Sequence, residues 1–311
     1  MTVLGLPLLG ETLLMTALLI AAVLLLRRPA AAWLGPRFAY ALWLLPALRL
    51  VLPPLPGGER VVMLTTRSGA ADQPLWIGAA EAPAAPPGLL DAMMPLVPLV
   101  WATGAAALLA MAVWRHIRWH RALLCQGTEL DPVEGIDVVM SDAVDGPVAV
   151  GLLRRTIAVP ADFFARYNRH ERELAIAHEV AHHRAGDLWA NAAALVVLAA
   201  QWFNPLAWAA HRAFRFDQEA ACDARVLADL SADHRARSAH SYACAIAKSV
   251  AGPRLLLAAP MTSGTKVKER LHMLTQEPRL GRRPLTGRLL LAGAATAVLA
   301  LTMSSLPARI V

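Results

Sequence analysis

Apolar residues along this chain gather into four runs that are separated by more polar stretches. The first and third runs, residues 4–26 and 95–114, reach the length of about 20 residues that a helix needs to cross the hydrocarbon core of a bilayer. The second and fourth runs, residues 37–53 and 289–303, are shorter. The pattern predicts a mainly α integral membrane protein with four transmembrane helices.

Basic residues follow the first and third runs and precede the fourth run, so a chain that crosses the membrane at each run has these clusters on one side. They occur at Arg27 and Arg28, within residues 115–121 and within residues 282–288. Because positive charges are enriched in cytoplasmic segments, we expect the chain to begin outside the cell and residues 54–94 to form an external loop. The charges follow the first apolar run instead of preceding it, which is typical of a membrane anchor and not of a cleaved signal peptide.

This topology divides the chain into three parts. Residues 1–114 are expected to form a three-span membrane domain, residues 115–287 a cytoplasmic domain, and residues 288–311 the fourth transmembrane helix with a short external tail. Within the cytoplasmic part, residues 136–160 are rich in Val and Ile around an Asp-Gly-Pro turn. This pattern predicts strands, so we expect an α+β fold there.

The stretch HERELAIAHEVAHHRAGD, residues 170–187, predicts a helix that ends at Gly186, with Asp187 as the cap of the next helix. Inside it, His178, Glu179 and His182 form an HExxH motif. Four residues are about one helical turn, so both imidazoles project from one face and can hold one ion. Glu179 can take a proton from a metal-bound water. The motif indicates a zinc metalloendopeptidase with one Zn²⁺ per chain.

Catalytic zinc takes three protein ligands, and Glu219 is the best candidate for the third. It begins the pattern Glu219-x-x-x-Asp223, which places both carboxylates on one helical face. Asp223 can then accept a hydrogen bond from the outer nitrogen of a ligand histidine. Cys222 is interpreted as a small buried residue, and His183 as pointing away from the metal. Three residues could stabilise the oxyanion, and the sequence does not choose among them: His234, His240 and Tyr242.

The apolar segment at residues 188–210 is easily mistaken for a further span. Because His182 and Glu219 must meet at one ion, the chain between them must cross the membrane twice or not at all. The segment is too short for two crossings, which need roughly 40 residues. We predict a helix that is buried in the protein or dips into the inner leaflet, a bend at Asn204-Pro205, and a return on the cytoplasmic side.

Composition agrees with a membrane protein. Of 311 residues, 57% are hydrophobic and 17% are charged, which is more apolar than a typical soluble domain. The basic clusters beside the apolar runs explain the net charge of +7. The sequence has no interleaved aromatic and basic residues of the kind that bind nucleic acid, so direct nucleic-acid binding is not expected. The three cysteines, Cys125, Cys222 and Cys244, fit no disulfide framework and suit a reducing cytoplasm.

Four segments together resemble the membrane metallopeptidase family of the penicillin-sensing BlaR/MecR transducers: GPVAVGLLRRTIAVP, AHEVAHHRAGD, WFNPLAW and DQEAACDARVL. The resemblance extends from about residue 1 to 305. It implies a gluzincin-like zinc domain between the third and fourth spans, with Glu179 as the base and Asp223 behind the ligands. The implied zinc ligands are His178, His182 and Glu219. It also implies that a substrate adds as a β-strand beside the strand that holds Gly151, Ile157 and Val159.

The resemblance further implies a multi-pass protein of the bacterial inner membrane with its active site on the cytoplasmic side. Its expected function is regulated proteolysis in signal transduction, with a protein substrate such as a transcriptional repressor or the chain itself. The expected partners also include membrane lipids and, as an open alternative, a second copy in a homodimer. In the sensing members a penicillin-binding domain follows the fourth span, whereas this sequence ends at Val311. We therefore expect a signal to enter through residues 54–94, the membrane or a partner.

Two other functions fit the same residues. A housekeeping quality-control protease of the HtpX type would degrade misfolded membrane proteins and not a single repressor. A non-catalytic transducer would use the zinc fold only as a scaffold. The presence of Glu179 argues against the scaffold, because a scaffold needs no base.

Overall fold

The computed structural model describes three long stretches, residues 5–52, 93–229 and 232–249, together with residues 259–260 and four single positions: 270, 289, 293 and 296. Apart from its last two residues, the predicted external loop lies outside these residues. The predicted fourth span and the external tail also lie outside them, except for three of the single positions.

The two longest helices of the described chain are α1 (Gly5–Leu34) and α5 (Leu96–Cys125), each of 30 residues. By length and composition both are able to cross a membrane, and only 6% of the apolar window of α5 is buried in the protein. Large apolar side chains such as Leu99, Val100 and Met111 are exposed on α5. Exposed apolar surface of this size favours contact with lipid.

The second apolar run forms two short helices in place of the predicted single span. They are α2 (Pro36–Ala41) and α3 (Leu44–Val51), with a turn at Leu42 and Trp43 between them. Pro46 lacks the amide hydrogen that would bond to the carbonyl of Leu42 in a continuous helix, which explains the break. Both short helices pack against α1, so α1–α3 form a helical hairpin.

A five-stranded mixed sheet follows α5. Its strands are β1 (Thr128–Val133), β2 (Ile136–Met140), β3 (Val148–Val150), β4 (Thr156–Val159) and β5 (Ala259–Pro260), in the spatial order β1-β2-β4-β3-β5. Strands β2 and β4 are parallel, whereas the other neighbouring pairs are antiparallel. The strands predicted within residues 136–160 are therefore confirmed as β2, β3 and β4.

The helices that follow β4 are α6 (Phe163–Arg166), α7 (Arg169–Ala185), α8 (Asp187–Ala200), α9 (Pro205–Asp229) and α10 (Ala232–Lys248). Helix α7 begins with a capping box, in which the Asn168 side chain accepts from the Glu171 amide and the Glu171 side chain accepts from the Asn168 amide. It ends at Gly186, whose φ of 71° is left-handed. The predicted end of this helix is confirmed.

Helices α8 and α9 form a second hairpin, and its bend falls at the predicted dipeptide. Pro205 is the first residue of α9, where its missing amide hydrogen costs no helical bond. The Asn204 side chain caps this end by accepting from the Leu206 amide at 2.9 Å. The Gln201 side chain fixes the tip by donating to the carbonyl of Leu13 in α1 at 2.6 Å.

Helix α5 also holds this tip. The Trp101 indole donates to the carbonyl of Ala200 at 2.8 Å, and the Trp202 indole donates to the carbonyl of Trp101 at 3.2 Å. A side chain at Gly104 would collide with the Trp202 ring, so glycine there allows the close approach. The tip of the α8–α9 hairpin therefore lies beside the beginnings of α1 and α5.

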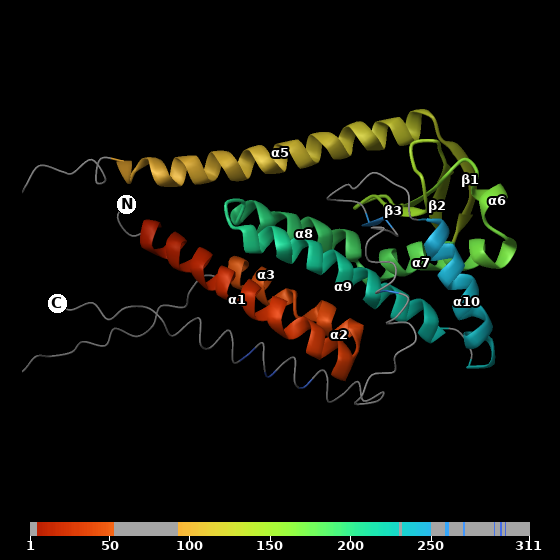
Figure 1. Ribbon diagram of the computed structural model, residues 1–311. Coiled ribbons are helices and arrows are strands. Elements are labelled where there is room, and N and C mark those ends of the chain that lie inside the picture. The colour runs from red at the N-terminus through yellow and green to blue at the C-terminus, as the bar shows by residue number, and fades with distance from the viewer. Residues whose placement is uncertain are drawn as a thin grey trace, which may run out of the picture.

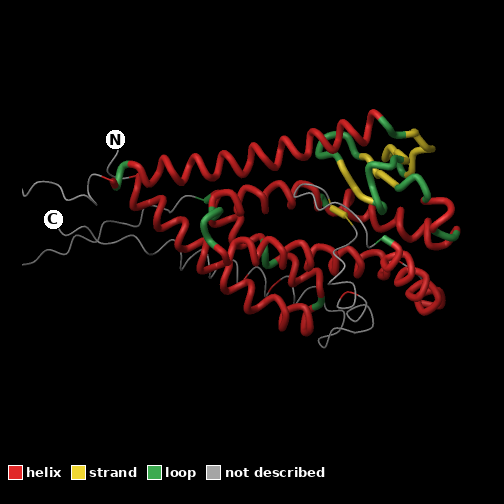
Figure 2. The backbone as a smooth tube through the Cα atoms, turned by 45° about the horizontal axis from the view of Figure 1, so that its top comes forward, coloured by secondary structure: helices red, strands yellow, loops and turns green. Residues whose placement is uncertain are grey.

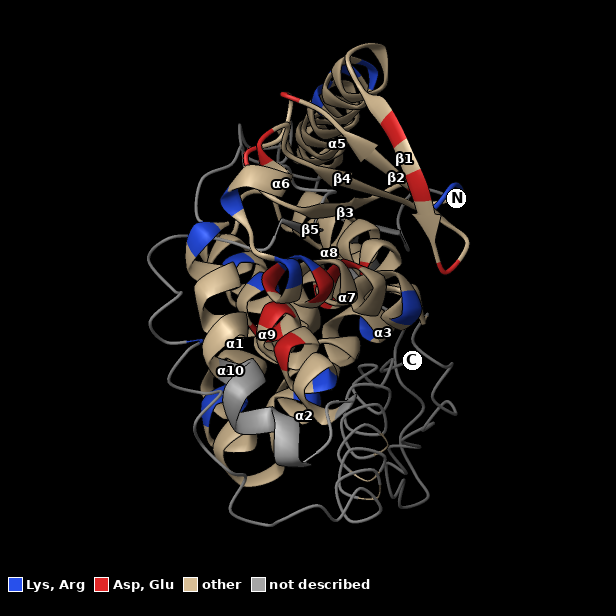
Figure 3. Ribbon diagram, turned by 90° about the vertical axis from the view of Figure 1, so that its right-hand side faces the viewer, with Lys and Arg blue, Asp and Glu red and all other residues tan. Residues whose placement is uncertain are grey.

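The long helices α1, α5, α8 and α9 run along one another, and the sheet lies at one end of them with α6, α7 and α10 (Figures 1 and 2). One buried apolar cluster joins the two hairpins through Ile20, Trp43, Leu198 and Phe214. Another joins the sheet to α7. Acidic positions of α7 and α9, red on the ribbon, lie below the sheet in Figure 3. The candidate site is found where these two helices meet.

Candidate metal centre

The HExxH residues lie on α7 at its contact with α9. His178, Glu179 and His182 are completely buried. The Nε2 atoms of the two imidazoles are 3.1 Å apart, so both point at the same small space. This is the arrangement that the four-residue spacing predicts on a helix.

The outer nitrogen of each imidazole has its own partner. His182 Nδ1 is 2.7 Å from a carboxylate oxygen of Asp187, and His178 Nδ1 is 2.5 Å from the Tyr242 hydroxyl. Since that hydroxyl donates to Asp223 at 2.7 Å, it accepts from His178. Both imidazoles therefore carry their proton on Nδ1, and each Nε2 has a lone pair for a metal.

The Glu219 carboxylate reaches this space from α9. Its oxygens lie 3.5 Å from His178 Nε2 and 3.7 Å from His182 Nε2. Donor atoms bound to one tetrahedral zinc are about 3.3 Å apart, so these three side chains fit a zinc ion. Neither Glu219 oxygen has a hydrogen bond among the described residues. Oε2 lies 3.2 Å from Arg270 Nη1, whereas a buried carboxylate oxygen such as Oε1, without a hydrogen bond, is expected where a metal cation completes the site.

Arg270 pairs with Glu219 at 3.2 Å and with both oxygens of Asp223 at 2.7 and 2.8 Å. Burial alone would raise the pKa of Glu219, but the Arg270 guanidinium and the imidazoles of His178 and His182 lower it to about 2. The carboxylate is therefore ionised at neutral pH, as a metal ligand must be.

A second residue of α9 reaches the same space. Donor atoms of His178, His182 and Cys222 lie within 4.8 Å of one another, and all three residues are buried. However, the Cys222 thiol points at the carbonyl of His178, at 3.4 Å. Burial and the nearby carboxylates, chiefly Glu219, raise the pKa of the thiol well above its usual range. Glu219 and Cys222 are thus two candidates for the third ligand, and the 3.5 and 3.7 Å approach of the Glu219 oxygens to the imidazoles favours the carboxylate.

Glu179 is held by the sheet. One of its oxygens, Oε2, accepts a hydrogen bond from the Ala149 amide of β3 at 2.6 Å, while Oε1 has no hydrogen-bond partner within the described part of the chain. Burial raises the pKa of Glu179 to about 8, against the opposite effect of His182. A carboxylate with a pKa in this range can accept and release a proton near neutral pH.

The residues expected on a substrate-binding strand are divided between β4 and the end of β3. Ile157 and Val159 lie in β4, which pairs with β2 on one side and β3 on the other, and both side chains are fully buried. No backbone of β4 is left for a further strand. Gly151 follows β3 with φ of 89°, and β3 pairs with β4 on one side and with the two-residue strand β5 on the other.

Three residues that the sequence assigned elsewhere, or did not assign, belong to this centre. Asp187, expected as a helix cap, binds His182 and is the first residue of α8. Tyr242, considered for the oxyanion, lies between His178 and Asp223, so Asp223 acts on the histidine through this hydroxyl. Arg270 was not a candidate, because a lone arginine carries no motif. His183, unlike the two HExxH histidines, points away from this centre and forms a hydrogen bond with the carbonyl of Thr156 in β4.

A buried HExxH helix with a glutamate supplied by a second helix defines the class of HExxH metallopeptidases. Within it, the chain belongs to the BlaR1 peptidase M56 family, whose model matches residues 7–274. It is thus a member of a membrane metalloprotease family that includes the BlaR/MecR signal transducers.

Two curated relatives illustrate the match. The methicillin resistance mecR1 protein of Staphylococcus aureus is 30% identical over 130 residues, which are 42% of this chain and 22% of the relative. The regulatory protein BlaR1 of Bacillus licheniformis is 28% identical over 90 residues, 29% of this chain and 15% of the relative. The matches thus span only a small part of these relatives.

Proposed function

We propose that this chain is a zinc endopeptidase that cuts a protein substrate during signal transduction at a membrane. The convergence of His178, His182 and Glu219 on one space, with Glu179 beside them, is the observation that carries this proposal. The family supports peptide hydrolysis. The donor set of two imidazoles and one carboxylate is a common catalytic zinc site.

The side chains divide the chemical work. When bound, zinc polarises the scissile carbonyl and makes an adjacent water more acidic. Glu179 takes the proton of this water and later returns it to the leaving amine. The Ala149 amide fixes one of its oxygens, which leaves the other to carry the proton. Asp187 and Tyr242 keep the lone pairs of His182 and His178 directed at the metal.

Strand β3 is the proposed binding site for the substrate backbone. It holds Glu179 through Ala149, and its outer side pairs with residues 259–260 of the same chain. An extended peptide that takes the place of residues 259–260 can pair with β3 through main-chain hydrogen bonds. The substrate is therefore an extended segment of a protein, such as a transcriptional repressor or this chain near β5.

The proposed topology keeps the centre on the cytoplasmic side of a bacterial inner membrane. Helices α1 and α5 cross the bilayer, α2 and α3 form a short second crossing, and residues 289–303 a fourth. The zinc domain covers residues 115–287, between the membrane domain of residues 1–114 and the last span in residues 288–311. The basic clusters beside the apolar runs support this orientation.

A comparison of proteomes from cells with the wild-type chain and with Glu179→Ala identifies the substrate. We expect one regulatory protein, or this chain itself, to remain uncut in the variant. Accumulation of many misfolded membrane proteins would instead indicate a quality-control protease of the HtpX type. Identical proteomes would contradict the proposed proteolysis.

A further inference from the structure

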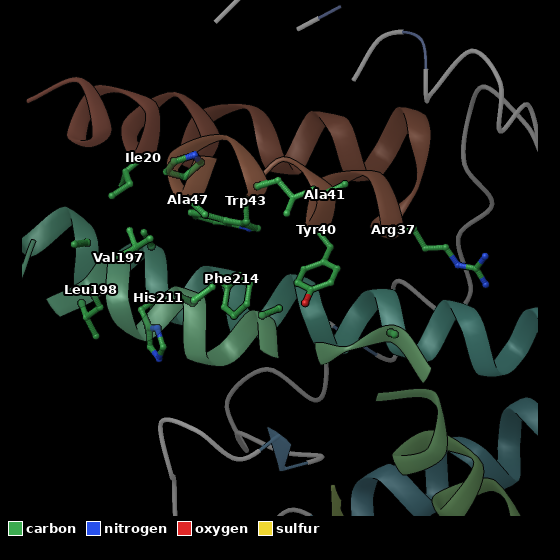
Figure 4. A pocket seen from close by; sticks show the side chains of 18 of the residues that line it. Ile20, Arg37, Tyr40, Ala41, Trp43, Ala47, Val197, Leu198, His211 and Phe214 are labelled. Atoms are coloured by element: carbon green, nitrogen blue, oxygen red, sulfur yellow. The ribbon is translucent and has the colours of Figure 1, made fainter. Parts of the chain in front are cut away.

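Polar contacts join the membrane hairpin α1–α3 to the helices of the metal centre. Tyr40 of α2 and Trp43, which follows it, face α9 across the space between the two hairpins (Figure 4). Their partners are three residues close to the metal ligands, namely Asp187, Asp217 and Gln218. The hairpin thus contacts the zinc domain at the residues that orient its ligands.

The Tyr40 hydroxyl forms hydrogen bonds with Asp187 at the start of α8 and with Gln218 of α9. Its hydroxyl donates to one oxygen of Asp187 at 2.9 Å, and the other oxygen of Asp187 holds His182 Nδ1 at 2.7 Å. The same hydroxyl accepts from the Gln218 amide group at 2.9 Å. Asp187 is completely buried, so no water competes for this carboxylate. One hydroxyl therefore connects α2 to a ligand histidine on α7 and to the residue before Glu219 on α9.

Asp217 provides a second connection at the same place. Its two oxygens accept from the Trp43 indole at 2.8 Å and from Arg27 of α1 at 2.5 Å. Asp217 and Gln218 directly precede Glu219 in the chain. The membrane hairpin therefore holds the turn of α9 that presents the third candidate ligand.

A cavity of about 350 Å³ lies between the hairpins beside these bonds and is lined mainly by small or apolar side chains, among them Ile20, Ala194, Ala210 and Phe214. Trp43 and Phe214 also pack together between the hairpins, and the cavity leaves room for a small shift of α2. Hydrogen bonds are directional, so the bonds of Tyr40 would change geometry with that shift.

We propose that Tyr40 is a positioning residue through which the membrane hairpin sets the metal centre. It orients Asp187 and thereby His182, so that the position of α2 against α9 determines how tightly the centre binds its metal. The inference rests on the proposed metallopeptidase function and adds its regulation. It gives a signal in the membrane helices a direct path of two hydrogen bonds to a ligand.

Tyr40→Phe in the full-length chain in detergent micelles tests this. The variant keeps the ring, whose centroid lies 5.5 Å from that of the Phe214 ring, and removes only the hydroxyl. Loss of an outer partner of a ligand histidine costs about 10–100-fold in metal affinity, and we expect the lower end, about 10-fold, because Tyr40 acts through Asp187. Zinc affinity is measured against a chromophoric chelator. The visible spectrum of the cobalt-substituted protein should also shift, because the ligand field changes.

Trp101→Phe is the matched control. It also removes a bond from a membrane helix to the zinc domain, here to the carbonyl of Ala200, but at the far end of α8. It should leave zinc affinity and the cobalt spectrum unchanged. Equal losses in both variants, or none with Tyr40→Phe, would overturn the proposal.

A double-mutant cycle locates the effect. In an Asp187→Ala background, Tyr40→Phe should change zinc affinity by less than about two-fold; a further 10-fold loss would overturn the path through Asp187. The zinc measurement needs no substrate. If the wild-type chain cleaves nothing but Tyr40→Phe weakens zinc binding, the proposed function is contradicted and the positioning role of Tyr40 is retained. If the chain is an active protease but Tyr40→Phe leaves zinc binding unaltered, the positioning role is contradicted and the proposed function is retained.

Discussion

Each of the two histidines of the candidate metal centre has a hydrogen-bond partner on its outer nitrogen. His178 is oriented by Tyr242 from α10, and His182 by Asp187 at the start of α8. These partners fix which nitrogen carries the proton, and so which nitrogen can bind metal. We therefore expect affinity for the metal to depend on these outer partners in addition to the HExxH residues.

Two residues of α9, Glu219 and Cys222, can be compared as candidates for the third ligand. Glu219→Ala should weaken zinc binding by more than the about 10–100-fold that an outer partner contributes, because a ligand is lost. Cys222→Ala should leave zinc binding unchanged, since its thiol points at the carbonyl of His178. Zinc content after dialysis against a weak chelator distinguishes the two. Loss of zinc in Cys222→Ala with retention in Glu219→Ala would assign the thiol as ligand.

Tyr242 provides a test of the outer partners alone. Tyr242→Phe removes the hydroxyl between His178 and Asp223 while keeping the ring, and should weaken zinc binding by about 10–100-fold. Ser249→Ala serves as the control, because its hydroxyl donates within the end of α10 to the carbonyl of Ile246. The measurement is a competition titration with a chelator. Unaltered affinity in Tyr242→Phe would show that His178 needs no such partner.

Among the elements, the α8–α9 hairpin exposes large apolar side chains next to α1 and α5. Trp189, Val196 and Phe203 are more than half exposed on it, and its tip contacts α1 at Leu13 and α5 at Trp101. Apolar surface beside two helices that are long and apolar enough to cross a membrane is suited to lipid and not to water. We therefore expect the hairpin to enter the bilayer and to return on the same side.

A spin label at Phe203→Cys, with Cys125 and Cys244 replaced by serine, tests this placement in lipid vesicles. The label should be relaxed by oxygen, which concentrates in the bilayer, and protected from a water-soluble nickel complex. A label at Leu153→Cys, an exposed turn position, should behave in the opposite way. Strong relaxation by nickel at position 203 would mean that the hairpin lies in water.

The whole molecule shows which features the sequence can predict. The HExxH helix, the strands of residues 136–160 and the bend at Asn204-Pro205 depend on local periodicity and on proline, and the structure confirms them. The interior position of β4 and the contact of Tyr40 with Asp187 depend on packing between distant segments. No local pattern encodes those contacts.

The central claim is that the chain is a metal-dependent endopeptidase with Glu179 as its base. Its most direct test compares the purified wild type with Glu179→Gln for bound zinc and for cleavage of a proteome-derived peptide library. We expect both proteins to hold about one zinc per chain, because the ligands are unchanged, and cleavage to fall by a factor of about 100 or more in the variant, because the base is lost. Full cleavage by zinc-loaded Glu179→Gln, or cleavage by the wild type that persists after its zinc is removed, would contradict the account.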